Sequence, residues 1–493
     1  MSDNRGLVLF VSLLGVIVVV AALATGAALL FPETTATDGP TFAERLLRVV
    51  SLRDPNTRFV LFGTLLLGTT AGVVGTFMLL RRQALVGDVV SHAALPGVAV
   101  AFIVGELIAP GSGRDLKWLL CGAALAGLAS VVCINLIRRF SRITPDAILA
   151  TVLGVFFGFG AVMFKVVQQM KTGGQAGLNH FILGSAATIT PDDIQLIASA
   201  GFVVLVICLL LFKELKLLCF DEDFAVAEGW PVFVLDITLT TLVVAVTVIG
   251  LKSVGILMVA LLITPPTAAR FWTENLGRMI GIAAGIGGAS AVLGSLASAL
   301  FDKLAGGPTI VLAGTMFFLI SLMFGTERGI VCRWLRHRRT QRRIGRDDLL
   351  RAMFEIIESR VNGDGVQIVE RLTTEAVEHA DLVSKRSWTA HRVNQIVSRG
   401  VNEGIVRMDT EHGWRLTQSG AREASRAVRN HRMWELYLIT QADIAPSHVD
   451  RDADFIEHVL EPELIEQLEQ LLAERDAQSV IPPSPHPIGK QGQ

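Results

Sequence analysis

The chain has 493 residues, of which 51% are hydrophobic and only 18% are charged, and its mean hydropathy is +0.52. These values exclude an ordinary soluble protein of this size, and the net charge of −1 indicates no class of partner until it is divided by region. Up to about residue 326, charges are sparse and apolar runs recur, whereas Arg, Asp, Glu and His crowd the remainder. We therefore expect a membrane domain followed by a soluble domain.

Ten apolar runs are candidates for transmembrane helices. The first covers residues 7–31 and lacks a clear cleavage site, so we interpret it as a retained helix rather than a signal peptide. The alternation of Lys and Arg between turns predicts that both chain ends are cytoplasmic. The other runs lie at 59–80, 84–108, 117–137, 146–168, 194–212, 232–250, 253–272, 278–300 and 309–325.

Three further features of the membrane region are less specific. Pro265-Pro266 is expected to break the run at 253–272 late in its course. The Gly-rich stretch 171–193 predicts an extracellular turn, in which His180 is more simply a solvated loop residue than a metal ligand. The five cysteines show no C-x-x-C spacing, which favours small core residues over a disulfide framework or a thiolate zinc site.

Asp88 and His92 place a carboxylate and an imidazole inside an apolar run. On a helix this spacing puts both side chains on one face, where they can share one cation. Pro96 lacks the amide hydrogen that would bond the carbonyl of His92, so that carbonyl also needs a partner. Ionisable groups at membrane depth usually line a pathway, which predicts an ion path here. The alternative is that Asp88 caps a helix and His92 is a hydrogen-bonded core histidine.

The run ALVGDVVSHAALPGVAVAF resembles the signature of the family 3 ABC importer permeases, which import manganese, zinc or iron. The resemblance covers roughly residues 42–326 and implies that Asp88 and His92 contact the transported metal. It also implies a fold like that of the vitamin B12 importer, in which irregular helices surround a pore between two permease subunits. The expected fold is an all-α polytopic membrane protein with about ten transmembrane helices, in the bacterial plasma membrane.

The segment FDEDFAVAEGWPV, residues 220–232, interrupts two apolar runs on the predicted cytoplasmic side. Asp221 can cap a short helix, Gly229 can end it in a left-handed turn and Pro231 can open the next span. The pattern is similar to the coupling segment by which such permeases dock on their ATPase. Its predicted contact residues are Phe220, Asp221, Phe224, Ala227 and Gly229.

No G-x-x-x-x-G-K-[ST] run occurs in the chain, so we expect no ATPase of this form in it and no enzyme activity. The resemblance therefore implies a separate ATP-binding ABC subunit, a second permease chain in a homo- or heterodimer, and an extracytoplasmic metal-binding protein. No cofactor is expected to be bound permanently; Mn²⁺, Zn²⁺ or Fe²⁺ would be transported or sensed.

Eight arginines between residues 328 and 346 predict a flank attracted to anionic membrane lipid more readily than a nucleic-acid arm. Beyond it, amphipathic runs at 347–360, 366–380 and 384–404 predict three helices, and IVRMD and WRLT predict a hairpin turning at 411–413. Together they indicate an α+β winged helix. Its third helix carries candidate DNA-binding residues, although a basic solvated face is about as plausible: Lys385, Arg386 and Arg392.

The runs HRMWE and EHVL then resemble the iron- and manganese-dependent repressors of the diphtheria toxin repressor family. His431 with Glu435 and a second group further along the chain combine carboxylate and imidazole, which suits manganese, ferrous iron or zinc. The resemblance implies that these residues bind metal in a helical regulatory domain. The second group comprises Asp450, Asp454, Glu457 and His458.

Two departures from the repressor pattern matter. Asp450 stands where a histidine is usual, and the acid expected near the start of the domain is replaced, since Asp348 is followed three residues later by Arg351. One of the two usual metal sites is therefore in question. The expected domains are 1–41 (extra helix and outer loop), 42–326 (permease), 327–346 (basic linker), 347–420 (winged helix), 421–478 (metal-binding and dimerisation-like) and 479–493 (disordered tail).

The function predicted from these patterns is a permease subunit importing a divalent transition metal, manganese first, with a cytoplasmic metal-sensing domain. Two alternatives stay open: a membrane-anchored metal-dependent transcription regulator, and a permease for iron–siderophore chelates.

Overall fold

The computed structural model describes residues 55–108, 115–170, 190–300, 304–361, 368, 370–386, 388–409 and 413–441. The chain divides into two compact units, Met1–Arg333 and Trp334–Gln493, which are described separately. The predicted first helix at 7–31, His180 and the predicted tail at 479–493 lie outside the described residues.

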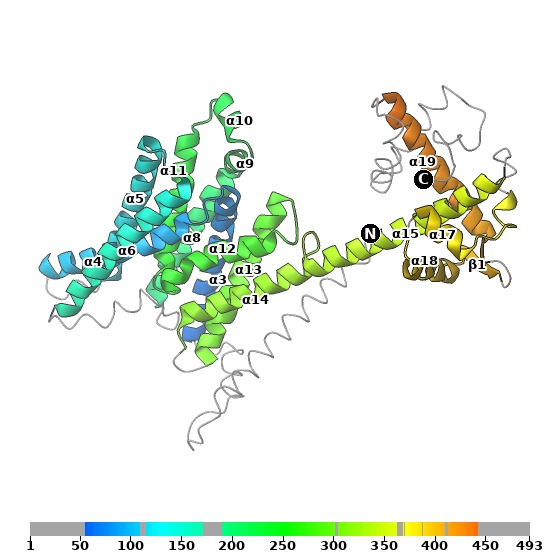
Figure 1. Ribbon diagram of the computed structural model, residues 1–493. Coiled ribbons are helices and arrows are strands. Elements are labelled where there is room, and N and C mark those ends of the chain that lie inside the picture. Colours follow the sequence, from blue (N-terminus) through cyan, green and yellow to red (C-terminus); the bar gives the residue numbers. More distant parts are fainter. Residues whose placement is uncertain are drawn as a thin grey trace, which may run out of the picture. The chain divides into compact units, whose positions relative to one another are not determined.

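The first unit is a bundle of helices (Figure 1). Within its described residues, eight helices are long and apolar enough to cross a membrane. Every predicted run in this part except that at 253–272 thus agrees closely with an observed helix. The helices are α3 (Pro55–Leu80), α4 (Val86–Ile108), α5 (Leu116–Phe140), α6 (Pro145–Gln169), α8 (Pro191–Leu210), α9 (Phe212–Phe220), α10 (Glu222–Ala227), α11 (Val232–Gly250), η4 (Gly255–Leu257), α12 (Met258–Ala269), α13 (Leu276–Leu300) and α14 (Gly306–Phe324).

The predicted run at 253–272 differs from the expectation. It forms the 3₁₀ turn η4 and the 12-residue helix α12, which is too short to span a bilayer of about 30 Å. The expected break at Pro265-Pro266 was wrong, because α12 continues through both prolines to Ala269. The irregular part lies instead at the start, where Gly255 takes a φ of +73° that other residues rarely adopt.

Small residues let the long helices of this unit pack closely. A Cβ atom on Gly68 of α3 would lie 2.3 Å from the carbonyl oxygen of Gly287 on α13, and one on Gly97 of α4 would lie 2.2 Å from that of Gly122 on α5. Neither contact leaves room for a side chain. Close backbone approach at small residues is typical of helix packing in membranes, where the hydrophobic effect does not drive helices together.

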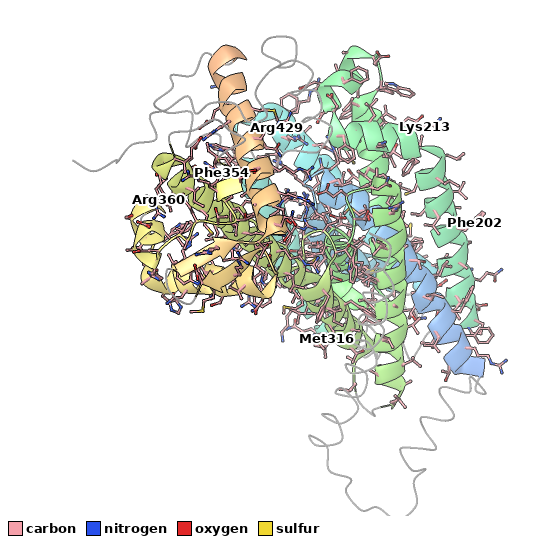
Figure 2. All side chains as sticks on the ribbon, turned by 90° about the vertical axis from the view of Figure 1, so that its right-hand side faces the viewer. Phe202, Lys213, Met316, Phe354, Arg360 and Arg429 are labelled. Atoms are coloured by element: carbon pink, nitrogen blue, oxygen red, sulfur yellow. The ribbon has the colours of Figure 1, made fainter. Side chains whose placement is uncertain are left out.

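Large apolar side chains also cover the outer side of the bundle. Phe202 on α8 is 66% exposed and projects away from the neighbouring helices (Figure 2). Exposed apolar surface of this kind fits contact with lipid or with another membrane chain.

The second unit contains the winged-helix elements that the sequence predicts. Strands β1 (Val406–Asp409) and β2 (Gly413–Leu416) pair antiparallel, with Val406 opposite Leu416. Helix α15 (Ile330–Arg360) supplies Leu349 and Phe354 to the core of this unit. The remaining described helices are α17 (His379–Arg386), α18 (Ala390–Asn402) and α19 (Gln418–Gln441).

The helices between α15 and β1 are divided differently from the prediction. Val377, expected to be helical, forms an antiparallel bridge with Trp414. The expected helix at 384–404 is split into α17 and α18, because the side chain of Thr389 accepts a hydrogen bond from the backbone N–H of Arg392 and so starts a new helix. Lys385 and Arg386 therefore lie on α17 and Arg392 on α18.

Candidate metal pathway and coupling segment

Asp88 and His92 lie on α4, whose most apolar stretch is 78% buried, the largest share among the described spans. Val89 and Val90, which lie between them, are at most 1% exposed. The side chains of Asp88 and His92 are nevertheless 32% and 23% exposed. The two ionisable residues are thus partly accessible positions on a mostly buried helix, which is expected for groups that line a pathway.

The two side chains face each other without being locked together. His92 Nε2 lies 3.5 Å from Asp88 Oδ1, which is longer than the usual N–H···O hydrogen bond of about 2.9 Å. The other ring nitrogen, Nδ1, is buried and has no hydrogen-bond partner among the described residues. This geometry supports the interpretation as cation ligands over that of a satisfied core histidine, since both groups keep bonding capacity to offer.

Helix α6 holds the imidazole in position. The ring of Phe157 meets that of His92 edge to face, with centroids 5.1 Å apart and an interplanar angle of 87°. This approach depends on Gly160, where a Cβ atom would lie 2.8 Å from Cδ of Pro96. In the described part of the chain no group of three or more His, Cys, Asp or Glu side chains is placed to hold a metal. A cation at Asp88 and His92 would therefore take its remaining ligands from elsewhere.

The segment between α9 and α11 has the predicted local structure. Oδ1 of Asp221 accepts a hydrogen bond of 2.9 Å from the backbone N–H of Phe224 and caps α10, and Gly229 takes a φ of +81° just after it. Ala225 is fully buried, whereas Phe220 and Phe224 are 63% and 51% exposed. The end of α9 and α10 thus each present one aromatic side chain outward, and the role of these residues in docking stays a prediction.

Sequence reasoning missed the residue that ties this segment to the rest of the bundle. Nη1 of Arg81, just after α3, lies 2.7 Å from Oε2 of Glu222 on α10, and Nη2 lies 2.9 Å from Oδ1 of Asp236 on α11. Nη1 also donates to the carbonyl of Leu218 on α9. The sequence offered one signal for this contact. Asp236 is a lone acid in an apolar run, and such an acid needs a positively charged or hydrogen-bonding partner.

Burial and charge act in opposite directions on Arg81. Burial alone lowers the pKa of its guanidinium, but the hydrogen bonds that it donates to Glu222 and Asp236, together with their charges, outweigh that effect and raise the pKa above its ordinary value. Arg81 therefore stays charged, and one guanidinium joins the end of α3 to three other helices. Its neighbour Gln83, three residues before α4, approaches the same Asp236 oxygen at 3.4 Å.

In the second unit, Trp334–Gln493, which contains the predicted soluble domain and is named the soluble unit for that reason, His431 and Glu435 lie one turn apart on α19, with His431 Nε2 3.1 Å from Glu435 Oε1. Their side chains are 5% and 3% exposed. The residue that the sequence flagged as a departure enters this pair directly, because Nη2 of Arg351 on α15 lies 2.9 Å from the same His431 Nε2. The other predicted ligands, Asp450, Asp454, Glu457 and His458, lie outside the described residues.

Comparison with known proteins then identifies the family. The profile of the ABC 3 transport family matches residues 54–325, which include α4 and the segment around α10. The chain belongs to the ABC 3 transport family.

Curated relatives of this ABC 3 permease extend the match. The chain is 38% identical over 408 residues to the manganese transport system membrane protein MntC of Bacillus subtilis (strain 168), covering 82% of this chain and 88% of that protein. It is 43% identical over 295 residues to the zinc transport system membrane protein TroC of Treponema pallidum (strain Nichols), covering 60% of this chain and 96% of that protein. Because 408 residues exceed the 325 up to the end of the family match, the first similarity reaches into the soluble unit.

A solved structure and a second family profile complete the comparison. The structure of PsaBC from Streptococcus pneumoniae in complex with Fab contains a chain 30% identical to this permease, with a TM-score of 0.52, covering 60% of this chain and all of that one. Residues 417–485 match the metal binding and dimerisation domain of iron-dependent repressors. The permease thus carries a repressor-type domain after its membrane helices.

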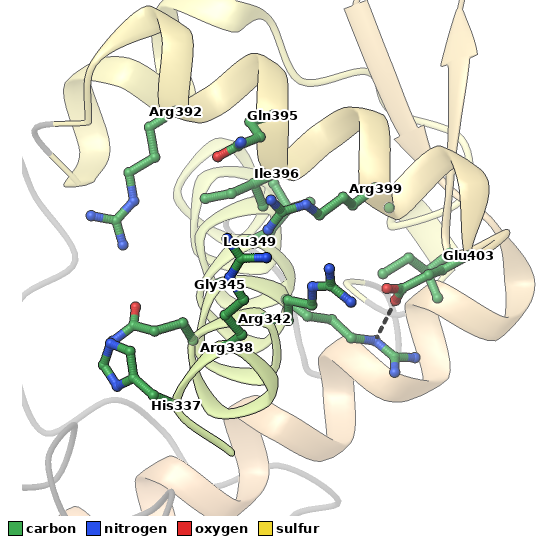
Figure 3. A pocket seen from close by; sticks show the side chains of 14 residues that line it. His337, Arg338, Arg342, Gly345, Leu349, Arg392, Gln395, Ile396, Arg399 and Glu403 are labelled. Atoms are coloured by element: carbon green, nitrogen blue, oxygen red, sulfur yellow. Dashed lines mark ion pairs between the residues drawn. The ribbon is translucent and has the colours of Figure 1, made fainter. Parts of the chain in front are cut away.

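The predicted DNA-binding residues of this permease lie on two helices, α17 and α18. Lys385 is committed to an ion pair of 3.2 Å with Glu355, and the side chain of Arg386 lies outside the described residues. Arg392 faces a pocket of about 470 Å³ between α15 and α18 (Figure 3). Five arginines and one carboxylate line it: Arg338, Arg342, Arg346, Arg392, Arg399 and Glu403.

The charge of this pocket is mostly uncompensated. Glu403 lies 3.4 Å from Nε of Arg346, which also pairs with Glu423. Among the described residues, no carboxylate pairs with the other four guanidinium groups of the pocket, although Arg338 stacks over Trp334. The pocket therefore attracts anions.

Proposed function

We propose that this ABC 3 permease conducts a divalent transition-metal ion across a bacterial plasma membrane into the cytoplasm, manganese first and zinc or iron second. The observation that carries the proposal is the Asp88–His92 pair, a partly exposed carboxylate and imidazole 3.5 Å apart on an apolar helix that is mostly buried. Imidazole with carboxylate suits all three metals. The manganese and zinc transport relatives agree with this chemistry.

Two ligands on one chain make a weak and therefore reversible site. A conducting site must bind its ion well enough to admit it and weakly enough to release it. Because Asp88 and His92 are partly exposed and the ring of Phe157 beside them is 46% exposed, we infer that the pathway runs between this chain and a second permease chain, in a homo- or heterodimer. That second chain and water would supply the remaining ligands.

A separate ATP-binding ABC subunit would drive transport by docking on α10. Phe220 and Phe224 offer exposed aromatic anchors there, and Asp221, Ala227 and Gly229 shape the short helix that presents them. Arg81 would carry the resulting movement to the turn before α4, since it bonds to residues of α9, α10 and α11. An extracytoplasmic metal-binding protein would deliver the ion on the opposite side.

The soluble unit would lie in the cytoplasm as a regulatory domain. Asp450, Asp454, Glu457 and His458 remain its predicted metal ligands, within a region that matches a repressor-type metal-binding domain. A regulator that no longer transports is the alternative, which requires sequence-specific operator binding together with membranes inactive in metal uptake.

The test is metal uptake by proteoliposomes that contain the permease with its ATP-binding subunit. We expect ATP-dependent accumulation of Mn²⁺, and of Zn²⁺ or Fe²⁺ more slowly, with Asp88→Asn and His92→Gln each reducing it severely. The matched control is Asp146→Asn, an exposed acid in the first turn of α6. Uptake of an iron–siderophore chelate with free ions ignored, or full uptake by Asp88→Asn, would reject the proposal.

A further inference from the structure

We propose that the guanidinium of Arg351 takes the place of a metal ion at His431 and Glu435, so that this pair holds the soluble unit together without binding metal. Three side chains from two helices meet there, and all are nearly inaccessible: Arg351 is 1% exposed, His431 4% and Glu435 2%. The proposal concerns the soluble unit alone and does not depend on transport.

The hydrogen-bonding chemistry of the contact defines the state of the imidazole. A guanidinium only donates hydrogen bonds, so the 2.9 Å contact between Arg351 Nη2 and His431 Nε2 requires that Nε2 present its lone pair. A metal ligand must present the same lone pair. Arg351 therefore uses the electron pair that a metal ion would need.

The carboxylate beside the imidazole completes the comparison with a metal site. Glu435 Oε1 lies 3.1 Å from His431 Nε2, close enough for both atoms to bind one cation. Two electron-rich atoms held at this distance in a buried place need a positive charge nearby. The charge of Arg351, which reaches His431 Nε2 from the neighbouring helix, supplies it.

Charged side chains of both signs surround the pair in the described part of the chain. Arg351 lies 3.8 Å from Glu355, which also pairs with Lys385 at 3.2 Å. Arg432, next to His431 on α19, pairs with Glu358 of α15 at 2.5 Å. A divalent ion bound to His431 and Glu435 would add two positive charges beside the buried guanidinium of Arg351, which is unfavourable.

The consequence is a fixed connection between the start of the domain and α19. Where the repressor pattern places an acid that helps bind metal, this chain has its own cation, so α15 and α19 are joined whether or not metal is present. His431 and Glu435 then act as positioning residues rather than as a sensor. Any metal response of the soluble unit would have to come from ligands other than this pair.

The experiment counts bound ions on the purified full chain in lipid nanodiscs. Mn²⁺ and Zn²⁺ are titrated separately, and ions per chain are compared for the native sequence, His431→Gln, Arg351→Met and the double variant Arg351→Met/His431→Gln. The matched control is Arg343→Met, which removes an exposed arginine two turns earlier on the same helix. Thermal unfolding of each variant checks that it is folded.

We expect the native chain and His431→Gln to bind equal numbers of ions, because the pair holds none. Arg351→Met should gain one ion per chain, and the double variant should lose it again. A loss of an ion in His431→Gln would overturn the proposal, as would a folded Arg351→Met chain with no gain. If Arg351→Met does not fold, the comparison of the native chain with His431→Gln decides alone, since a glutamine oxygen can still accept from Arg351.

Discussion

Arg81 joins the two parts of the proposed transport machinery through one side chain. Its guanidinium is 9% exposed and bonds to Glu222 on the coupling helix and to Asp236 on α11, while its backbone lies in the turn that leads to α4. In the proposed mechanism, a movement of α10 would reach the helix that carries Asp88 through these charge-assisted contacts.

Replacing this residue should uncouple ATP hydrolysis from transport. Arg81→Met leaves Asp236, whose side chain is 16% exposed, without its cation, which costs up to about 3 kcal/mol because one partner of a largely buried pair remains uncompensated. We expect reduced yield and severely reduced Mn²⁺ uptake, measured in proteoliposomes, while the ATP-binding subunit still hydrolyses ATP.

A second variant separates folding from coupling. Arg81→Met/Asp236→Leu removes both charges, so yield should recover, since replacing both partners is far less costly than removing one. Uptake should stay low in this variant. Recovery of uptake along with yield would mean that Arg81 serves stability alone.

At the scale of elements, α10 has the features of a docking helix whose inner side is fixed to the bundle. It is capped by Asp221, anchored by the fully buried Ala225 and tied through Glu222 to Arg81. Its exposed side chains include the apolar Phe224 and Val226, beside the acidic Glu222 and Asp223 of its first turn. The apolar pair suits a partner surface with a hydrophobic groove.

We predict that Phe224→Asp abolishes association with the ATP-binding subunit. The side chain is 51% exposed, so the new carboxylate does not disturb the bundle but would be buried without a partner in the complex. Co-purification measures the loss. Met408→Asp, which adds the same acid at a residue that is 75% exposed in the soluble unit, should leave the complex intact. A stable complex with Phe224→Asp would place the docking surface elsewhere.

The pocket between α15 and α18 leads to a prediction about polyanions. Because its arginines are mostly uncompensated, we expect duplex DNA to bind the full chain without sequence preference and with steep salt dependence. Arg392→Ala/Arg399→Ala should weaken this binding equally for all sequences and reduce the salt slope by about two.

Fluorescence anisotropy at stepped salt concentrations measures this effect. Arg371→Ala is the matched control, since Arg371 is an exposed arginine outside the pocket that pairs with Glu375. Tight, sequence-specific binding that survives both substitutions would contradict the prediction and favour a regulator.

The sequence predicts an element well when the contacts that fix it join residues close together in the chain, and poorly when they join distant residues. Apolar runs of adequate length predicted the spans, and the Asp221 cap and Gly229 turn were readable because their contacts are local. The division of residues 366–404 into separate elements could not be predicted in this way, because Val377 forms a bridge to Trp414, which lies in a distant strand. Arg81 likewise meets Glu222 and Asp236 at separations of 141 and 155 residues, which no local pattern reveals.

The candidate sites show the same contrast. Asp88 and His92 are four residues apart on one helix, so their approach follows from helical geometry. Arg351 was recognised only as a departure from a pattern. Its contact with His431, 80 residues away, depends on how α15 and α19 pack. The sequence therefore identified the right residue without indicating its partner.

At the scale of the whole molecule, the proposed transport residues all lie in the first compact unit, together with the match to the ABC 3 family. A chain that ends at Arg333 keeps Asp88, His92, Arg81 and the coupling segment. We therefore predict that it assembles with its ATP-binding subunit and retains ATP-dependent Mn²⁺ uptake. Loss of uptake in an intact complex would show that the soluble unit is required for transport itself.

The most direct test of the account asks whether the metal touches His92. The chain that ends at Arg333 contains only two histidines, His92 and His180, which makes the nitrogen signal simple to assign. Pulsed electron paramagnetic resonance of bound Mn²⁺ should show coupling to an imidazole nitrogen, which persists in His180→Gln and disappears in His92→Gln. Coupling that survives in His92→Gln, or Mn²⁺ bound with no nitrogen coupling at all, would contradict the assignment of Asp88 and His92 to the metal pathway.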